Sequence, residues 1–187
     1  MKKSLLFLTV IGSVIAIVFF VYQGTINGLL NAERHVNTQW GNVEKQYQLR
    51  ANLVSNLVDT VKVYAGNELS SLKNVIEARA NATQITIDPS FLNEHTIAQF
   101  LQTQNELESA INNLLICAEA YPAFKACPFF LDLQKKLKEN ENRIITESTL
   151  FNKASKEYNQ LILAFPGNII ADVENFIQKP YFTNKTL

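Results

Sequence analysis

The sequence predicts an all-α protein, in which an N-terminal transmembrane helix precedes an antiparallel up-and-down four-helix bundle. Three observations predict this fold class. The N-terminus carries a long uncharged run, apolar residues recur about every 3.5 positions in the segments that follow, and only 6 glycines and 5 prolines interrupt the 187 residues. So few turn-forming residues argue against disorder and against an all-β domain.

The uncharged run, from Leu5 to Val21, predicts a membrane anchor. Together with Ser4 and Tyr22 it makes about 19 helical residues, roughly 28 Å, which is close to the thickness of the bilayer core. A cleaved signal peptide usually has a shorter apolar core and ends at a small-residue cleavage site, which the sequence after the run lacks. An uncleaved anchor that contacts the lipid bilayer through residues 4-22 is therefore preferred over a cleaved signal.

The charges beside the anchor predict its orientation. Lys2 and Lys3 precede it, and the next basic residue is Arg34. Because positively charged flanks stay in the cytoplasm, we expect the domain on the outer side of the membrane. The predicted segments are a cytoplasmic N-terminus and anchor at 1-23, a four-helix bundle at 24-166 and a C-terminal tail at 167-187.

A heptad seam predicts the first helix of the bundle, because residues three and four positions apart share one face of a helix. The seam ends at Ala65-Gly66-Asn67, where glycine suits a helix C-terminus. Its large side chains are expected to be buried. The seam consists of Ile26, Leu29, Glu33, Val36, Trp40, Val43, Tyr47, Arg50, Val54, Leu57, Val61 and Tyr64.

A shorter helix and a connector are predicted next. Leu69, Leu72, Val75-Ile76 and Ala80 keep helical spacing, and the stretch TQITIDPS, from Thr83 to Ser90, then breaks it. β-Branched residues favour extended backbone, and a proline keeps the preceding residue out of the helical region. Since a lone strand would have no partner in a helical chain, we expect this stretch to connect two helices.

Two further seams predict the third and fourth helices. The third stops at Pro122, and the fourth begins near Pro128 and stops at Pro166-Gly167, because proline suits a first helical turn but not a helix interior. Four amphipathic segments with short connections favour antiparallel neighbours. The seams consist of Ile97, Phe100, Gln104, Leu107, Ile111, Leu114, Ala118 and Tyr121, and of Phe130, Leu133, Leu137, Asn140, Ile144, Glu147, Phe151, Ala154, Tyr158, Leu161 and Phe165.

Five polar residues interrupt these seams: Glu33, Arg50, Gln104, Asn140 and Glu147. An unpaired buried polar group costs about 1–3 kcal/mol. A straight helix drifts by about 20° per heptad, so the preferred interpretation places these residues at the rim of the core. The alternatives are an internal polar network, register-setting pairs, or a small-ligand site between the helices.

Composition and motifs argue against several function classes. The 17 basic and 17 acidic residues balance and form no patch, so no nucleic acid partner is expected. The two histidines, His35 and His95, match no zinc-hydrolase motif, and no glycine-rich phosphate loop occurs. We therefore expect no catalytic residue, no metal and no cofactor, in a protein that is not an enzyme.

Two cysteines, Cys117 and Cys127, flank the corner between the third and fourth helices. If the domain is exported, an oxidising compartment would preserve a disulfide between them. Two small buried or loop thiols are the preferred alternative.

Seven stretches carry a family resemblance, in the order QWGNVEKQYQLRANL, NLVDTVKVYA, VIEARANAT, AEAYPAFKACPFFLDLQ, ENRI, EYNQLILAFPGNIIA and KPYF. Together they resemble the LemA family of bacterial membrane-anchored helical proteins, over essentially the whole chain after the anchor. The resemblance implies a four-helix bundle behind a transmembrane helix, and no established reaction. Ser55 and Asn52 depart from the family's usual proline and acid, which favours one continuous first helix.

The resemblance also implies a set of signature residues. For Tyr158-Asn159 and for Pro166-Gly167-Asn168, capping and turn-forming roles are preferred over binding. The candidate structural signature is Trp40, Tyr64, Arg79, Tyr121, Asn142, Arg143, Tyr158, Asn159, Pro166, Gly167 and Asn168.

The tail after Pro166 carries apolar residues at helical spacing and then Lys179: Ile169, Ile170, Val173, Phe176 and Ile177. It is expected either to cap the open end of the bundle, which is preferred, or to lie at the membrane interface with a snorkelling lysine. Both alternatives place it beside the start of the first helix.

We interpret the protein as a single-pass scaffold or interaction protein of the bacterial inner (cytoplasmic) membrane, with an unknown envelope protein as its partner. One alternative is a small-ligand-binding or enzymatic bundle that uses its buried polar residues. The other is an accessory to a membrane protease or export system.

Overall fold

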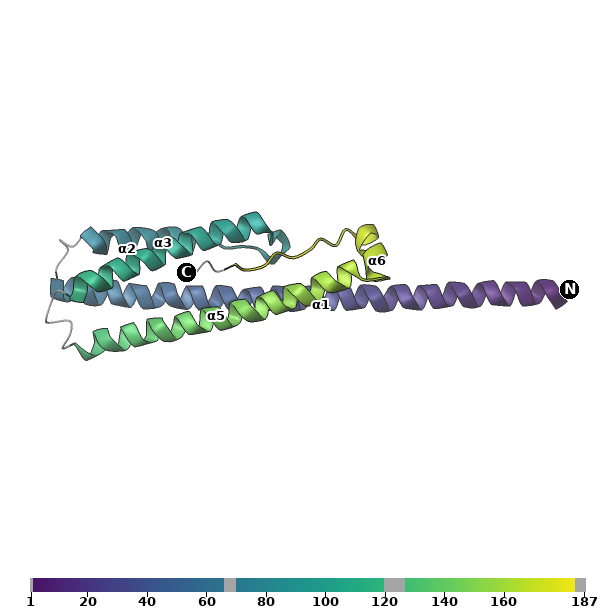
Figure 1. Cartoon of the computed structure of the whole chain (residues 1–187), viewed down its shortest axis with the longest axis horizontal. Coiled ribbons are helices and arrows are strands. Elements are labelled where there is room, and N and C mark those ends of the chain that lie inside the picture. Colours follow the sequence, from purple (N-terminus) through teal and green to yellow (C-terminus); the bar gives the residue numbers. More distant parts are fainter. Residues whose placement is uncertain (1, 66–69, 120–126, 184–187) are drawn as a thin grey trace. The chain divides into compact units, whose positions relative to one another are not determined.

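The computed structural model describes residues 2–65, 70–119 and 127–183, and within these ranges the chain forms helices and no strand (Figure 1). The all-α class is therefore confirmed. In chain order the elements are α1 (Lys2–Ala65), α2 (Ser70–Gln84), the 3₁₀ helix η1 (Pro89–Phe91), α3 (Glu94–Glu119), α5 (Pro128–Leu163) and α6 (Gly167–Glu174).

Helix α1 runs without a break from the predicted anchor through the first heptad seam, over 64 residues. Its N-terminal part, from Leu6 to Val21, is exposed. Among the helices of the described ranges, it alone is long and apolar enough to cross a membrane, a test that an N-terminal signal sequence would also pass.

The chain divides into two compact units, which are described separately below. The first unit contains Met1–Asn37 and Lys153–Lys179, and the second unit contains Thr38–Asn152 and Pro180–Leu187. Helices α1 and α5 contribute to both units, because each passes a unit boundary without interruption.

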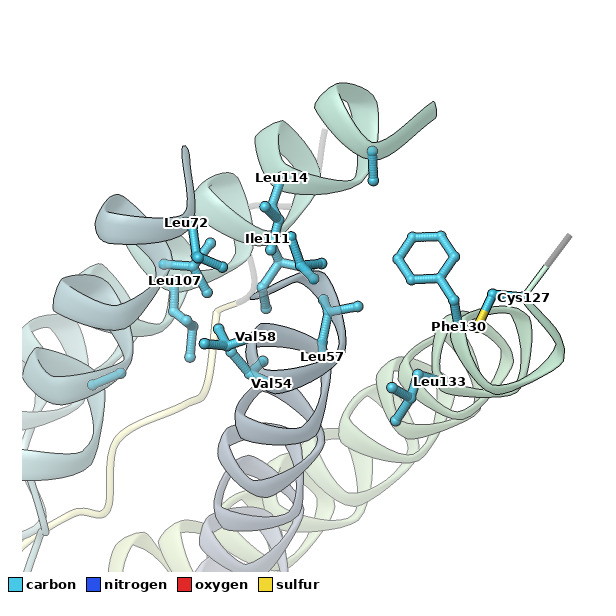
Figure 2. Packing of buried hydrophobic residues seen from close by; sticks show 14 residues of the cluster. Val54, Leu57, Val58, Leu72, Leu107, Ile111, Leu114, Cys127, Phe130 and Leu133 are labelled. Atoms are coloured by element: carbon cyan, nitrogen blue, oxygen red, sulfur yellow. The ribbon is translucent and has the colours of Figure 1, made fainter. Parts of the chain in front are cut away.

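A hydrophobic cluster in the second unit draws on four helices (Figure 2). A fully buried aliphatic side chain contributes about 1.5–3 kcal/mol through removal from water, so this cluster is a main source of the unit's stability. Its labelled members are Val54, Leu57 and Val58 of α1, Leu72 of α2, Leu107, Ile111 and Leu114 of α3, Phe130 and Leu133 of α5, and Cys127 just before α5.

Aromatic rings extend the core of the second unit around Trp40. The indole ring meets Phe100 and Phe151 edge to face, with centroids 5.4 and 5.6 Å apart, and it is fully buried, as predicted. Phe182 packs against Trp40 and Tyr47 in tilted geometry, with centroid distances of 6.4 and 6.3 Å. Phe182 of the tail thus lies against α1 at Trp40 and Tyr47.

The stretch TQITIDPS is a connector, as predicted, although α2 continues through its first two residues. Residues 85–88 are irregular, and the Asp88 side chain then caps η1 by accepting from the Ser90 N–H at 2.8 Å. Helix α3 starts with a reciprocal cap, since Asn93 accepts from the Thr96 N–H and Thr96 Oγ1 accepts from the Asn93 N–H, both at 3.0 Å.

The predicted seams are buried along most of their length, with one error at the end of α5. Leu161 and Phe165 are 44% and 80% exposed, whereas Ile162 is buried. A 3.5-residue period places Leu161 on the seam, but a straight helix turns every 3.6 residues, so the buried stripe has drifted to Ile162. Phe165 lies in the turn after α5, outside the helix to which the period applies.

The predicted tail helix is present as α6, in the first unit. Gly167, Ile170 and Ala171 are buried, while Ile169 and Val173 on the same helix are exposed. The helix ends at Asn175, which takes a left-handed conformation and donates its N–H to a backbone oxygen of α6. One face of α6 therefore packs against the rest of the first unit, and the other does not.

Candidate functional site

An open groove of about 1060 Å³ lies in the second unit. Helices α2 and α3, which pack against each other, form its walls, and Tyr181 and Thr183 of the tail lie at its edge. Small or apolar residues line the floor, among them Ala78, Ala98 and Leu101. The groove is open to solvent and does not enclose a small molecule in the way a typical ligand pocket does.

The charged groups that line the groove all have the same sign. Glu77 comes from α2, and Glu94 and Glu106 come from α3, whereas no lysine, arginine or histidine is among the described residues that line it. Carboxylates spread along one groove, without a basic group among them, give it a negative potential. The groove is therefore suited to a partner that carries positive charge.

Side-chain amides line both walls of the groove. Asn74 and Asn81 stand seven residues apart on α2, while Gln102, Asn105 and Asn113 lie on α3. The Gln102 side chain donates to Glu106 at 3.2 Å. Within the described part of the chain, no hydrogen bond is found for the side chains of Asn74 and Asn81, so their donors and acceptors face solvent.

Two asparagines of α5 hold the tail through its backbone. In the second unit, Asn152 donates to the Phe182 carbonyl at 2.8 Å and accepts from the Phe182 N–H at 2.6 Å. In the first unit, Asn159 donates to the Lys179 carbonyl and accepts from the Lys179 N–H, both at 2.8 Å. Each side-chain amide thus binds both the backbone N–H and the backbone carbonyl of one tail residue. A neighbouring antiparallel β-strand would form the same two hydrogen bonds with that residue.

The same tail residue forms a buried ion pair in the first unit. Lys179 Nζ lies 2.7 Å from Glu33 Oε1 and 5.7 Å from the centroid of the Tyr158 ring. Burial and the nearby Glu33 carboxylate raise the pKa of Tyr158, whose hydroxyl has no hydrogen-bond partner in the described structure. Lys179 is buried and neutralised by Glu33, so it does not snorkel, as the less favoured of the two alternatives for the tail would require.

The rim interpretation of the polar seam residues is wrong for three of them. Arg50, Gln104 and Asn140 are only 5%, 3% and 2% exposed. Arg50 pairs with Glu141 and with Glu108 at 3.7 Å, and the amides of Gln104 and Asn140 donate to backbone oxygens of Ala82 and Gln46 at 3.1 and 3.0 Å. The side-chain oxygens of Gln104 and Asn140 are buried without a hydrogen-bond partner in the described structure. These side chains form internal polar contacts rather than a solvated edge.

The buried polar contacts leave little room for a ligand. Burial lowers the pKa of Arg50, and the neighbouring Glu108 carboxylate and Tyr47 side chain oppose that effect. A cavity beside Tyr47 and Gln104 has a volume of about 60 Å³, which is comparable to two water molecules. The geometry thus favours a structural role for Arg50.

The candidate signature residues lie at separate places and serve packing and turns. Trp40 Nε1 donates to the Ile87 carbonyl at 3.3 Å, and Arg79 Nε donates to the Ala51 carbonyl at 2.8 Å. Tyr158 and Asn159 meet the tail, as described. Asn142 and Arg143 are exposed on α5.

The remaining signature residues cluster at the turn after α5. Pro166 occupies the N-cap position of α6, and the Asn168 N–H donates to the Ala164 carbonyl at 2.9 Å. A Cβ atom on Gly167 would overlap the backbone oxygen of Leu161, so only glycine fits there. The side chain of Tyr64, and Tyr121 entirely, lie outside the described residues.

Cys117 and Cys127 are thiols in the structure rather than a disulfide. Cys127 is buried at the edge of the hydrophobic cluster, and Cys117 is partly exposed. The disulfide alternative therefore draws no support from their arrangement.

Two functional residues were not identified from the sequence. Asn152 is not among the candidates from the sequence, and the sequence predicts no buried ion pair for Lys179. A signal was present, since Asn152 and Asn159 stand seven residues apart, which places them on one face of α5 about 10.5 Å from each other. Three residues of extended chain, from Lys179 to Phe182, span about 9–10 Å and match that distance.

Comparison with known proteins gives one family and several distant relatives. The model of a family described as LemA family matches residues 39–186. The protein LemA of Metamycoplasma hominis is 21% identical over 157 residues, which cover 84% of this chain and 68% of that protein. The magnetosome proteins MamQ 1 and MamQ 2 of Paramagnetospirillum magneticum are each 22% identical over 192 residues, covering 92% of this chain and 71% of theirs.

Proposed function

This chain belongs to the LemA family, and from that premise we propose that it is a membrane-anchored binding protein of the bacterial cell envelope, without an enzymatic activity of its own. The observation that carries the proposal is the groove between α2 and α3, whose described lining residues carry acidic and amide side chains and no basic one. The proposed ligand is a basic, extended segment of an envelope protein.

The proposed domain architecture is an antiparallel four-helix bundle formed by α1, α2, α3 and α5. Residue contacts within the second unit support it. From Trp40 to Ala51 of α1, the residue numbers of the contacting partners increase on α3 and decrease on α5 and from the connector into α2. Helix α3 therefore runs in the same direction as α1, and α2 and α5 run in the opposite direction, as in an up-and-down bundle. The contacts are Trp40 with Phe100, Phe151 and Ile87, Arg50 with Glu108 and Glu141, and Ala51 with Arg79.

The proposed location is the inner membrane, crossed once by α1, with the domain outside the cytoplasm. The exposed apolar side chains of residues 6–21 support the anchor, because such a surface would be costly in water. Lys2 and Lys3 support the orientation. External protease should digest the domain in cells whose outer barrier has been opened, and protection beside a digested control protein would refute the orientation.

The chain itself provides a precedent for the proposed binding mode. Asn152 and Asn159 on α5 each hold one backbone unit of an extended segment. Asn74 and Asn81 have the same seven-residue spacing on α2 and face the groove. Backbone recognition of this kind accepts many side chains, so the acidic groups Glu77, Glu94 and Glu106 would supply the preference for a basic segment.

A binding measurement tests the groove. The full chain, in lipid nanodiscs, is titrated with a ten-residue peptide of lysine and alanine around a central proline, which favours extended backbone. We expect saturable binding that weakens at least tenfold when Glu77, Glu94 and Glu106 are all changed to Gln, and also in the double variant N74A/N81A.

The matched control removes the same charge elsewhere. Asp132, Glu139 and Glu157 are exposed on α5 and do not line the groove, so changing them to Asn, Gln and Gln should alter the affinity less than twofold. Equal losses in the two triple variants would show that the peptide responds to net charge alone, and would refute the groove as the binding site.

A further inference from the structure

An apolar ridge is exposed in the first unit, on and beside α6. Its members stand four residues apart, so those within the helix share one face. Monomeric proteins in water rarely expose several large apolar side chains together without a function. The ridge consists of Phe165, Ile169, Val173 and Ile177, which are 80%, 56%, 66% and 61% exposed.

Helix α6 lies beside α1 at the end of the anchor. Tyr22, the last residue of the predicted span, donates a hydrogen bond from its hydroxyl to Glu174 in the last turn of α6. At the other end of α6, Gly167 lies against Leu161, and a small cavity there is also lined by Gly24 and Thr25 of α1. Figure 1 shows α6 lying across the direction of α1.

These contacts fix the depth of α6 relative to the anchor. If α1 crosses the bilayer to Tyr22, then residues 22–25 lie in the outer interface, and a helix bonded to them lies in the same layer. A helix that crosses the direction of a membrane span runs roughly parallel to the membrane plane. Its exposed apolar ridge is then placed where acyl chains meet the headgroups.

We infer that α6 is a second membrane-attachment element, which rests in the outer leaflet interface of the bilayer with its ridge against lipid. The inference rests on the proposed anchoring of α1. The opposite face of α6, with Ile170 and Ala171, is buried within the first unit, so the helix can bind lipid without leaving its place in the fold.

The charges on α6 specify the kind of lipid contact. The helix carries Asp172 and Glu174 and contains no lysine or arginine. Anionic headgroups therefore do not attract it, and its binding depends on the apolar ridge. Depth in the membrane should be the same in neutral lipid and in lipid that contains phosphatidylglycerol.

Spin labelling of the full chain in vesicles tests the inference. The two native cysteines are first replaced so that they do not react with the label. Cys117 is partly exposed and is changed to Ser, and Cys127 is buried and is changed to Ala, which keeps an apolar side chain there. Labels are then placed singly through Ile169→Cys or Val173→Cys, which change exposed residues only. We expect both labels to collide more with oxygen, which dissolves in lipid, than with a nickel complex, which stays in water.

Two reference positions make the result decisive. A label at Ile145, exposed on α5 in the second unit, should favour the nickel complex, and a label at Val14 in the anchor should favour oxygen. If Val14 favours oxygen while Ile169 and Val173 behave like Ile145 in phosphatidylcholine vesicles, the inference about α6 is overturned. If Val14 also favours nickel, the anchoring itself fails.

Discussion

Asn159 forms a closed pair of hydrogen bonds with the backbone of Lys179, as donor to the carbonyl and as acceptor from the N–H, each at 2.8 Å. The asparagine is buried, so water does not compete for either bond. This contact fastens the tail to α5, and it accounts for the stretches EYN and KPYF without any binding partner.

Changing Asn159 to Leu should therefore weaken the attachment of the tail. If the tail stayed in place, the backbone polar groups of Lys179 would be buried without partners, at a cost of about 1–3 kcal/mol each, so this cost favours release of the tail. We expect a lower urea midpoint and faster protease cleavage after residue 174. Asn142→Ala, at an exposed position of the same helix, is the control and should change neither.

Removing the charge of Arg50 should destabilise the second unit. In Arg50→Met, the carboxylates of Glu141 and Glu108, which are 26% and 34% exposed, lose their buried cation, and the expected loss is about 1.5–3 kcal/mol, as for a hydrogen bond to a charged group. Urea unfolding followed by the fluorescence of Trp40, the single tryptophan, measures the loss. If the triple variant with Glu108→Gln and Glu141→Gln is no more stable than Arg50→Met, the assigned ion pairs are wrong.

Two glycine substitutions should have opposite effects. Gly41 lies exposed inside α1 with open space around it, so Gly41→Ala should stabilise the protein by about 0.5–1 kcal/mol through helix propensity. Gly167→Ala should destabilise it by about 1–3 kcal/mol, because a Cβ atom there overlaps the Leu161 carbonyl oxygen. Thermal unfolding of both variants is the measurement, and a shift of the same sign in both would contradict the packing at Gly167.

The stability of the second unit should fall at high pH through Tyr47. Burial raises the pKa of Tyr47 from its usual 10 to about 12. The folded state therefore holds this proton more tightly than the unfolded state, so the contribution is complete below pH 10 and is lost as pH rises toward 12. It amounts to about 2–3 kcal/mol. Tyr47→Phe should lose correspondingly less stability than the parent between pH 10 and 12, and parallel losses would contradict the burial of the hydroxyl.

Helix positions and most of the core followed from local pattern. The seam from Trp40 to Val61 is buried as its period predicted, because repeats of apolar residues reflect the helix geometry directly. The connector after α2 was also predictable from β-branched residues and Pro89. The end of α5 was not, since the drift between periods of 3.5 and 3.6 accumulates over its 36 residues.

The candidate site was less accessible to sequence reasoning. Arg50 and Gln104 were assigned to the rim, because whether a polar residue is buried depends on partners that are distant in the chain, such as Glu141 and the Ala82 carbonyl. The groove also depends on contacts between residues that are distant in the chain. Glu77 and Glu106 come together only when α2 packs on α3, and no motif in either helix records that contact.

The central claim is that the acidic groove between α2 and α3 holds a partner in the cell, and site-specific photocrosslinking tests it most directly. A photoreactive phenylalanine is placed at Gln102 in the groove or, as a control, at Ile145 on the exposed surface of α5. The account predicts a discrete crosslinked product from position 102, absent from position 145, that disappears when Glu77, Glu94 and Glu106 are changed to Gln but persists in the control triple variant of Asp132, Glu139 and Glu157. A product from position 102 that survives the loss of the three groove carboxylates, or no product there at all, would contradict it.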